Sequence, residues 1–413
     1  MLYSAAAVFA LTSCEDEAGD TNTTVACENQ EINPADTTEN GTQIIYKNCN
    51  IEADEVWTSE NIYVLNGRIS VVNNATLTIQ PGTIVKGQTG AGATASALVV
   101  SRDGMIMANG TAQAPIIFTS IVDRIEPGEV VSPNMESNNN GNWGGVIILG
   151  SAPISASAAE VQIEGIPTSD QNGLYGGTEA GDNSGEFTYV SIRHGGTNIG
   201  AGNEINGLTL GGVGSGTTIA NIEVVANQDD GIEWFGGTVD VSNVVIWNCG
   251  DDGLDTDQDW IGTCDNFLVV TPKGGSAFEL DGPEGDEFSG EMHTFTNGTV
   301  YAGSDIANLV DWDDNTNAAL TNVYFYGIDA SYGYVGGDDS FEPFASFGGT
   351  DVSATSNLEV TLAAGVALDF LFEDVVPASV SLVGEGAATV GVDASGFGWT
   401  WAAQAGALTQ IGL

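Results

Sequence analysis

The chain has 413 residues, of which 7 are Lys or Arg and 56 are Asp or Glu, so its formal net charge at pH 7 is −49. This charge excludes nucleic acid as a natural partner and disfavours anionic polysaccharides and anionic lipids, because such surfaces repel the protein. Cations are the expected counterpart, although an acidic surface by itself also keeps an extracellular protein soluble. The 56 Gly residues and 42% hydrophobic residues indicate a β-rich fold with many tight turns rather than disorder.

The N-terminal segment is predicted to be a lipoprotein leader. Residues 1–10 are apolar, and the sequence Leu-Thr-Ser-Cys at 11–14 places small residues before Cys14. We expect Cys14 to be lipidated and to anchor the protein to the outer membrane. The acidic residues 15–17 resemble the tag that directs lipoproteins of Bacteroidota to the cell surface. Residues 15–40, rich in Thr, Asn, Asp and Glu, are predicted to form a flexible tether.

Four further cysteines follow Cys14, and an even number in an exported protein predicts disulfide bonds. Four cysteines allow three connectivities. We favour the pairs Cys27 with Cys49 and Cys249 with Cys264, because each pair closes a short local loop. The chain contains no Cys-x-x-Cys spacing, which argues against a thiolate metal site or a redox motif.

Residues 41–349 are predicted to form a right-handed parallel β-helix, an all-β solenoid. Five asparagines recur at intervals of 20 to 30 residues, and a strand-like run follows each of them. Side-chain amides stacked at a bend of the solenoid would bond one another and the turn backbone, which gives these residues a structural role. The asparagines are Asn221, Asn243, Asn266, Asn297 and Asn322.

Segments 231–235, 253–257 and 277–281 align as successive coils. Side chains alternate across a strand, so Ile232 is expected to point inward and Glu233 outward. The equivalent residues are Leu254 and Phe278 in the inward column, and Asp255 and Glu279 in the outward column. Coils lie about 4.8 Å apart, so neighbouring carboxylates repel by roughly 1 kcal/mol in water, and bound cations would relieve this repulsion.

Two acidic segments are candidate calcium sites, with solvated acidic turns as the alternative. In each, oxygen-bearing side chains alternate along a loop, as they do where proteins wrap hard cations such as Ca²⁺. Neither segment has the Gly and the Glu that an EF-hand carries at its sixth and twelfth positions. The predicted ligands are Asp255, Asp257, Asp259, Asp311, Asp313 and Asn315.

Four stretches, at 141–150, 163–167, 182–196 and 202–216, resemble those of a family of Bacteroidota surface β-helix lipoproteins. The resemblance runs from about residue 69 to residue 281. It implies a surface β-helix without an established activity. Some members of that family carry the label of multidrug transporter, which the sequence does not support, because it has no apolar run long enough to span a membrane.

A looser resemblance is to pectinase-like right-handed β-helices. In polygalacturonase-like hydrolases, paired aspartates activate water and protonate the leaving oxygen. The catalytic residues of this alternative are Asp229, Asp230, Asp251 and Asp252. The same Asp-Asp-Gly triplets also suit turns, where Gly supplies a positive φ and Asp caps its own backbone. Arg193 and His194 precede the aspartates rather than follow them, so a structural role is favoured for this pair.

Four tryptophans offer flat surfaces on which the sugar rings of a glycan could stack. Packing in the core or between coils is the more common use of such residues and is favoured here. The glycan-stacking candidates are Trp234, Trp247, Trp260 and Trp312.

From residue 350 the repeat pattern changes, and residues 350–413 are predicted to cap the solenoid. This segment is expected to fold back over an apolar outward column. Alternatively, the column mediates self-assembly into a surface layer. The column comprises Val225, Val245, Trp247, Leu268 and Val270.

The sequence therefore predicts a surface-anchored, calcium-stabilised β-helix with a structural, adhesive or glycan-binding role. Its expected partner is a cell-surface glycan or protein. A polysaccharide-degrading hydrolase and a self-assembling surface-layer component are the alternatives. Architecture alone is weak grounds for choosing among them, because one fold hosts many functions.

Overall fold

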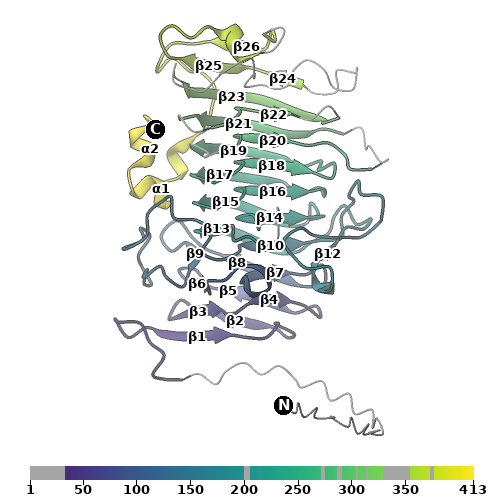
Figure 1. The fold of residues 1–413 in the computed structure, drawn as a ribbon, viewed down its shortest axis with the longest axis vertical. Coiled ribbons are helices and arrows are strands. Elements are labelled where there is room, and N and C mark those ends of the chain that lie inside the picture. The colour runs from purple at the N-terminus through teal and green to yellow at the C-terminus, as the bar shows by residue number, and fades with distance from the viewer. Residues whose placement is uncertain are drawn as a thin grey trace, which may run out of the picture.

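The computed structural model describes residues 33–199, 205–270, 275–285, 291–303, 306–312, 315–328, 354–372 and 376–413. The chain winds into a column of stacked coils whose strands lie across the long axis (Figure 1). The predicted leader, most of the tether, Cys14 and Cys27 lie outside the described residues. No helix among the described residues is long and apolar enough to cross a membrane.

The first large sheet takes one strand from each of eight coils, and all of its neighbouring strands are parallel. Because each strand lies above its equivalent in the preceding coil, the repeat becomes a ladder of identical positions. The strands are β4 (Arg68–Val71), β7 (Ala97–Val100), β10 (Val146–Leu149), β14 (Leu208–Gly211), β16 (Ile232–Phe235), β18 (Leu254–Asp257), β20 (Phe278–Leu280) and β22 (Asp311–Trp312).

The second large sheet has 16 strands and forms the other faces of the coil. Short strands of the first coils merge into longer, bent strands further along. The short strands are β1 (Gln43–Lys47), β2 (Glu55–Trp57), β3 (Asn61–Leu65), β5 (Thr76–Ile79), β6 (Ile84–Gly87), β8 (Met105–Asn109) and β9 (Ile116–Ser120). The later strands are β13 (Gly185–Arg193), β15 (Thr218–Val225), β17 (Val241–Trp247), β19 (Thr263–Val270), β21 (His293–Tyr301), β23 (Ala318–Ile328), β24 (Ala354–Ser356), β25 (Leu358–Leu362) and β26 (Val380–Leu382).

The long strands bend at one left-handed residue each. The first half of β13 pairs with β8 and the second half pairs with β9. Tyr189 lies between the halves with a φ of +50°, and the five asparagines of the repeat occupy the equivalent place in β15 to β23 with φ between 55° and 60°. Asn tolerates this conformation because its short polar side chain bonds locally.

Hydrogen bonds link the asparagines in two groups, and between the groups Asn297 donates to Asp265 at 2.7 Å. Asn266 donates from Nδ2 to Oδ1 of Asn243 at 2.8 Å, and Asn322 donates to Asn297 at 3.0 Å. Asn357, with a φ of +52°, extends the second group by donating to Asn322 at 3.1 Å. The structural role predicted for the asparagine column is thus confirmed.

The interior of the coil is one apolar core. Ile232, Leu254 and Phe278 stack inward in register, as predicted. Three of the glycan-stacking candidates are also in this core, so the core packing favoured for them is confirmed and they present no face to a glycan. Trp234 lies two residues after Ile232 and faces the same way, and it stacks on Trp260 with ring centres 4.6 Å apart. Trp234, Trp260 and Trp312 are each at most 1% exposed.

The predicted disulfide between Cys249 and Cys264 is absent, and both residues are buried free thiols. Cys264 pairs in register with Val241 at the start of β17, whereas Cys249 follows the end of that strand. Eight residues of extended chain span roughly 26 Å, and a disulfide requires Cα atoms within about 7 Å. Cys49 is disulfide-bonded, but its predicted partner Cys27 lies outside the described residues.

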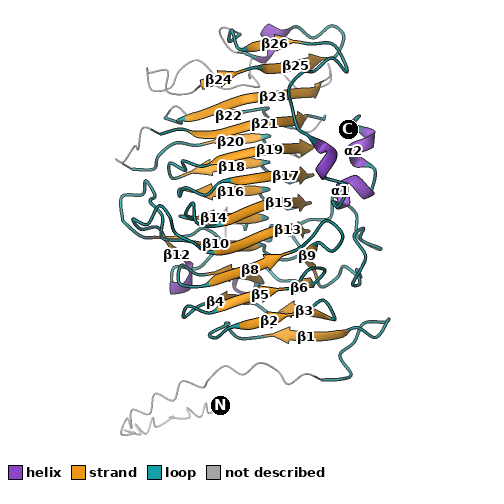
Figure 2. Cartoon of the chain, turned by 180° about the vertical axis from the view of Figure 1, so that it is seen from behind, coloured by secondary structure: helices purple, strands orange, loops and turns teal. Residues whose placement is uncertain are grey.

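The C-terminal tail folds back along the column, as Figure 2 shows for the helices α1 (Trp401–Gln404) and α2 (Ala407–Gln410). Thr400 begins α1 by accepting the N–H of Ala403 on its hydroxyl. The tail covers the outer face of β15, β17 and β19, which we call the covered flank. Its buried apolar residues are Val225, Val245, Leu268, Val270, Phe397, Trp401, Ala402 and Leu408.

This docking confirms the expected fold-back and occupies the surface predicted for self-assembly. The apolar column is not exposed, so self-association through it is not available to the folded chain. Of the column, only Trp247 keeps partial exposure, and it packs edge-on against Trp401 with ring centres 5.8 Å apart.

A buried ion pair lies under the tail. The Arg193 guanidinium approaches the Glu223 carboxylate at 3.6 Å, and its centre lies 4.9 Å from the ring centre of Trp401. Glu223 in turn accepts the N–H of Ala402 at 2.9 Å. His194 packs edge-on against Trp401, and burial lowers the pKa of this imidazole to about 4. The pair Arg193 and His194 therefore holds the tail, in line with the favoured structural role.

Candidate functional site

A ladder of acidic side chains runs along the outer face of the first sheet. Glu233 on β16 pairs in register with Asp255 on β18, Asp255 pairs with Glu279 on β20, and Glu279 pairs with Asp311 on β22. We call this face of the four strands the acidic flank. The alternation predicted from sequence is confirmed, but the flank is not an open grid, because Glu233 is 6% and Asp255 is 7% exposed.

The Asp-Asp-Gly triplets link one coil to the next. Asp230 accepts the backbone N–H of Asp252 at 2.9 Å, and Asp252 accepts the N–H of Ser276. Gly231 does not have the positive φ expected for it. It is required for close stacking instead, because a Cβ there would lie 2.4 Å from the carbonyl oxygen of Gly253. Two of the four candidate catalytic aspartates therefore already serve as caps between coils.

Three buried carboxylates converge beside this ladder. One oxygen from each of Asp230, Glu233 and Asp255 lies within 4.8 Å of the others. Asn206 donates from Nδ2 to Glu233, while its Oδ1 is buried and has no hydrogen-bond partner in the described part of the chain. We call these four residues the carboxylate cluster. The four ion pairs among the described residues involve other acidic residues, so none of them neutralises the cluster.

Burial and mutual repulsion raise the pKa of every carboxyl group in the cluster. Burial is the larger cause for Asp230, Glu233 and Asp255, whose pKa values rise well above the usual range, and neighbouring carboxylates add to it. Glu233 and Asp255 share a hydrogen bond, which requires a proton on one of them. The same causes raise the pKa of Asp257 to about 7 and that of Glu279 to about 9. The cluster must hold either protons or a cation.

The donor set of the cluster suits a hard cation. Three carboxylates and one amide oxygen are the ligand types of Ca²⁺, and no sulfur or imidazole belongs to the group. The unpartnered Oδ1 of Asn206 would gain a partner in a bound ion. The residues present therefore fit calcium, which would supply two positive charges to the ladder.

The described residues Asp255, Asp257 and Asp259 of the first predicted loop site are not gathered into one group, and the second predicted site includes a residue outside the described part of the chain. Asp255 and Asp257 are two residues apart on β18, so their side chains lie roughly 7 Å apart along the strand and do not close on one ion. Asn315 donates to the carbonyl of Pro283 rather than offering its oxygen there. Asp311 belongs to the ladder, and Asp313 lies outside the described residues. The carboxylates that do converge come from successive coils instead of successive positions of one loop.

A second group joins Asp229, Asp230 and Asp251, again with one oxygen from each within 4.8 Å of the others. Retaining glycosidases hold their two carboxyl groups about 5–5.5 Å apart, and inverting ones about 6.5–9.5 Å apart. Here the nearest oxygens of the three aspartates all lie within 4.8 Å of one another, so one ion or proton can be shared among them. This spacing favours a shared cation or proton over an acid and base placed on two sides of a glycosidic bond.

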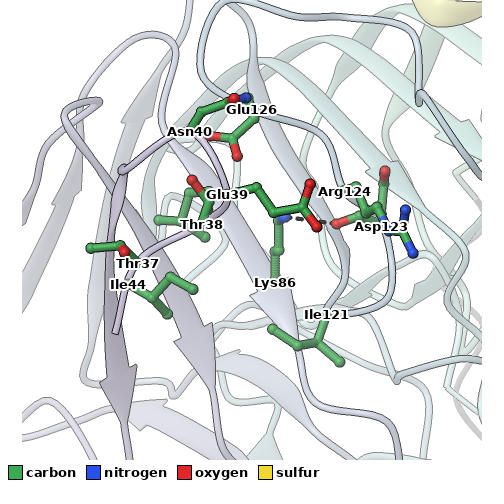
Figure 3. A pocket seen from close by; sticks show the side chains of 11 residues that line it. Thr37, Thr38, Glu39, Asn40, Ile44, Lys86, Ile121, Asp123, Arg124 and Glu126 are labelled. Carbon is green, nitrogen blue, oxygen red and sulfur yellow. Dashed lines mark hydrogen bonds between the residues drawn. The ribbon is translucent and has the colours of Figure 1, made fainter. Parts of the chain in front are cut away.

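A pocket at the N-terminal end also contains charged residues (Figure 3). It has a volume of about 310 Å³, and Lys86 lies in its wall. The buried ammonium of Lys86 donates to the carbonyl oxygens of Asp123 at 2.7 Å and Ile125 at 3.1 Å. Asp123 accepts from Thr119 and Ser132. These bonds hold the loop after β9. They supply acceptors to the buried ammonium of Lys86, so no ligand is needed to explain its position.

Stacked parallel coils with a carboxylate cluster on one outer face define the chain as a right-handed parallel β-helix with a candidate cation site. It belongs to the family of pectate-lyase-like β-helix domains, whose model matches residues 49–332. Searches of curated proteins and of solved structures return no match to the chain.

Proposed function

We propose that this protein is a calcium-stabilised β-helix that acts at the cell surface as a structural, adhesive or glycan-binding element. The observation that carries the proposal is the carboxylate cluster, in which three buried acidic groups have no cationic neighbour among the described ion pairs. Buried charges are costly unless they are paired or coordinate a metal. Calcium supplies that pairing and joins three successive coils, through Asn206 before β14, Asp230 and Glu233 in the coil of β16, and Asp255 on β18.

Surface attachment is supported by the sequence of the leader and by the charge. A Cys14 lipid would hold the column to the outer membrane, with the tether between them. The net charge of −49 keeps such a column soluble and directs it toward cationic partners. Trp247, the partly exposed member of the four candidate tryptophans, is the residue on which a glycan would stack.

Thermal unfolding with calcium and with a chelator tests the cation site. At a calcium concentration of 100 times Kd, the bound ion should stabilise the fold by about 2.7 kcal/mol, so the midpoint should rise by several degrees. Asp255→Asn should abolish this rise. Glu60→Gln, at an exposed turn far from the cluster, is the matched control and should keep it. An equal calcium response in wild type and Asp255→Asn would contradict the proposal.

The hydrolase alternative is tested with neutral and acidic glycans. Retention of a glycan without released products supports a binding element, whereas released oligosaccharides support an enzyme that uses Asp229, Asp230, Asp251 or Asp252. Asp251→Asn separates the two readings, because Asp251 is exposed and its loss should leave the fold intact. Loss of product release in Asp251→Asn would establish the hydrolase.

A further inference from the structure

A groove separate from the carboxylate cluster lies beside the antiparallel hairpin of β11 (Val161–Gln162) and β12 (Leu174–Tyr175). It has a volume of about 620 Å³, within the range of small-ligand sites, and the ends of β16 and β18 form its floor. Tyr175 and Phe235 form an aromatic corner, with ring centres 6.0 Å apart and planes at 62°. One wall of the groove is therefore apolar and rigid.

The lining of the groove also carries negative charge. Glu164, Asp257 and Glu284 line the groove, and none of the described residues that line it is Lys, Arg or His. Burial raises the pKa of the Tyr175 phenol, and Asp257, Glu233, Glu284 and Glu164 raise it further. The groove therefore offers a ligand hydrogen-bond acceptors and a negative field beside an aromatic ring.

The side chain of Gln258 independently indicates that the groove lacks a hydrogen-bond donor. Its side chain lines the groove, is only 3% exposed and donates from Nε2 to Glu284. Its Oε1 has no hydrogen-bond partner in the described part of the chain. The bond to Glu284 orients this side chain, and the backbone beneath it is held by the Gln258 N–H, which donates to Asp257 at 2.6 Å. An enclosed acceptor without a donor costs free energy, which a ligand carrying N–H groups recovers.

We propose that this groove binds an organic ammonium group carried on an apolar stem. The ammonium provides N–H donors to Glu284 and Gln258 and opposite charge to Asp257 and Glu164, while the stem packs on Tyr175 and Phe235. Aromatic faces attract ammonium ions, which adds to the fit. A hard metal ion suits the groove less well. Such ions require oxygen ligands on all sides, and part of the groove lining is apolar.

Free diamines and lysine side chains of a partner protein share this chemistry. Titration calorimetry of the purified protein with 1,5-diaminopentane at about 0.15 M salt measures the first source. Nα-acetyl-lysine-amide measures the second, and 1,5-pentanediol has the same stem without the charge. We expect saturable one-to-one binding of an amine and no binding of the diol. Equal binding of the diol, or no saturable binding of either amine, would overturn the proposal.

Variants separate this site from non-specific attraction to an acidic protein. Glu284→Gln, at an exposed position, should weaken amine binding about ten-fold or more, since one charged hydrogen bond is lost. Glu60→Gln should leave it unchanged. Glu233→Gln should abolish the calcium response but keep amine binding, so failure of the calcium proposal and failure of this one are distinguishable. Equal amine affinity in Glu284→Gln and Glu60→Gln would refute the groove as the site.

Discussion

The covered flank and the acidic flank are two outer faces of the same coils. Both contain buried outward residues, but burial has opposite effects on stability in the two flanks. On β15, β17 and β19 the outward residues include Val225, Val245 and Leu268, and the chain's own tail removes them from water. On β16 and β18 the outward residues include Glu233 and Asp255. Burial stabilises the first flank by about 25 cal/mol per Å² of apolar surface, whereas it destabilises the second unless protons or a cation neutralise it.

The comparison shows that the inward column sets the fold while the outward columns are free to differ. The core is filled by Ile232, Leu254 and Phe278, and its packing does not depend on which residues point outward beside them. One outer face can therefore become a docking surface and the other a cation site without a change in coil geometry. Perturbations of the two flanks should consequently have different signs and different dependence on calcium.

Trp401→Ala should have the largest effect. It removes a buried indole that covers Arg193 and packs on Val225, so the free energy of unfolding should fall by about 3–5 kcal/mol, with or without calcium. Urea unfolding measures the loss. Leu382→Ala, at a residue that is 58% exposed, is the control and should change little. A loss confined to calcium-free buffer would mean that the flanks are not independent.

The two flanks should respond to pH in opposite directions. For Asp257 and Glu279 the folded pKa values, about 7 and about 9, exceed the unfolded values near 4. The folded state then holds more protons, and stability in chelator should fall as pH rises from about 5 to about 9, by at most about 1.4 kcal/mol per pH unit per group. The folded pKa of His194, about 4, lies below its unfolded value of about 6.5, so the covered flank should lose stability as pH falls through that window.

Denaturant unfolding in chelator across this pH range measures both effects. We call the loss of stability as pH rises the alkaline arm, and the loss of stability as pH falls the acid arm. Glu279→Gln should reduce the alkaline arm and leave the acid arm unchanged, while His194→Asn, which tolerates the φ of +62° at this position, should do the reverse. Added calcium should reduce the alkaline arm. An alkaline arm that survives in Glu279→Gln would show that other groups cause it.

Asn266→Ala should cost about 1–2 kcal/mol, because Ala is strained in the left-handed region. Asn266 also accepts the N–H of Asp393 at 2.7 Å, so it joins the asparagine column to the tail. Asn266→Gly keeps the backbone conformation and loses only the amide bonds, and its loss of stability should be the smaller. Thermal unfolding compares the two, and a larger loss in the Gly variant would contradict the explanation by backbone conformation.

Glu233→Gln should have the smallest effect on stability and the opposite sign. Without calcium the raised pKa of the Glu233 carboxyl group costs the folded state free energy at neutral pH, because this group must take up a proton on folding, and Gln avoids that cost, so the variant should be more stable than wild type in chelator. With calcium it should be less stable than wild type. A variant that is destabilised in chelator would argue that the Glu233 carboxylate is satisfied without a cation.

The coil repeat made much of the fold predictable from sequence. Asn221, Asn243 and their equivalents gave the position of the bend, and the alignment at Ile232, Leu254 and Phe278 gave the register. The apolar column also predicted that the C-terminal tail would fold back over it. These features depend on one residue type recurring at one place, which a single sequence displays directly. The burial of Trp234 was predictable as well, because it has the same strand parity as Ile232.

What failed were inferences that treated neighbours in sequence as neighbours in space. Cys249 and Cys264 are 15 positions apart but lie at opposite ends of two paired strands, whereas Glu233 and Asp255 are 22 positions apart and adjacent. The prediction of calcium sites within single loops rests on the same reasoning, whereas the carboxylates that converge come from successive coils. The amine groove requires the hairpin around Tyr175 to meet Asp257, a packing arrangement that no local pattern predicts.

The fold-back of the tail has a consequence for how the chain is completed. Ala402 bonds Glu223, which precedes it by 179 residues, so strands β15 to β19 are made long before their cover. During synthesis from the N-terminus, or after cleavage before residue 397, the chain carries an open apolar strip on an otherwise finished column. That strip closes only when the last residues arrive, so its exposure marks an incomplete molecule and gives chaperones and proteases a means to tell unfinished chains from finished ones.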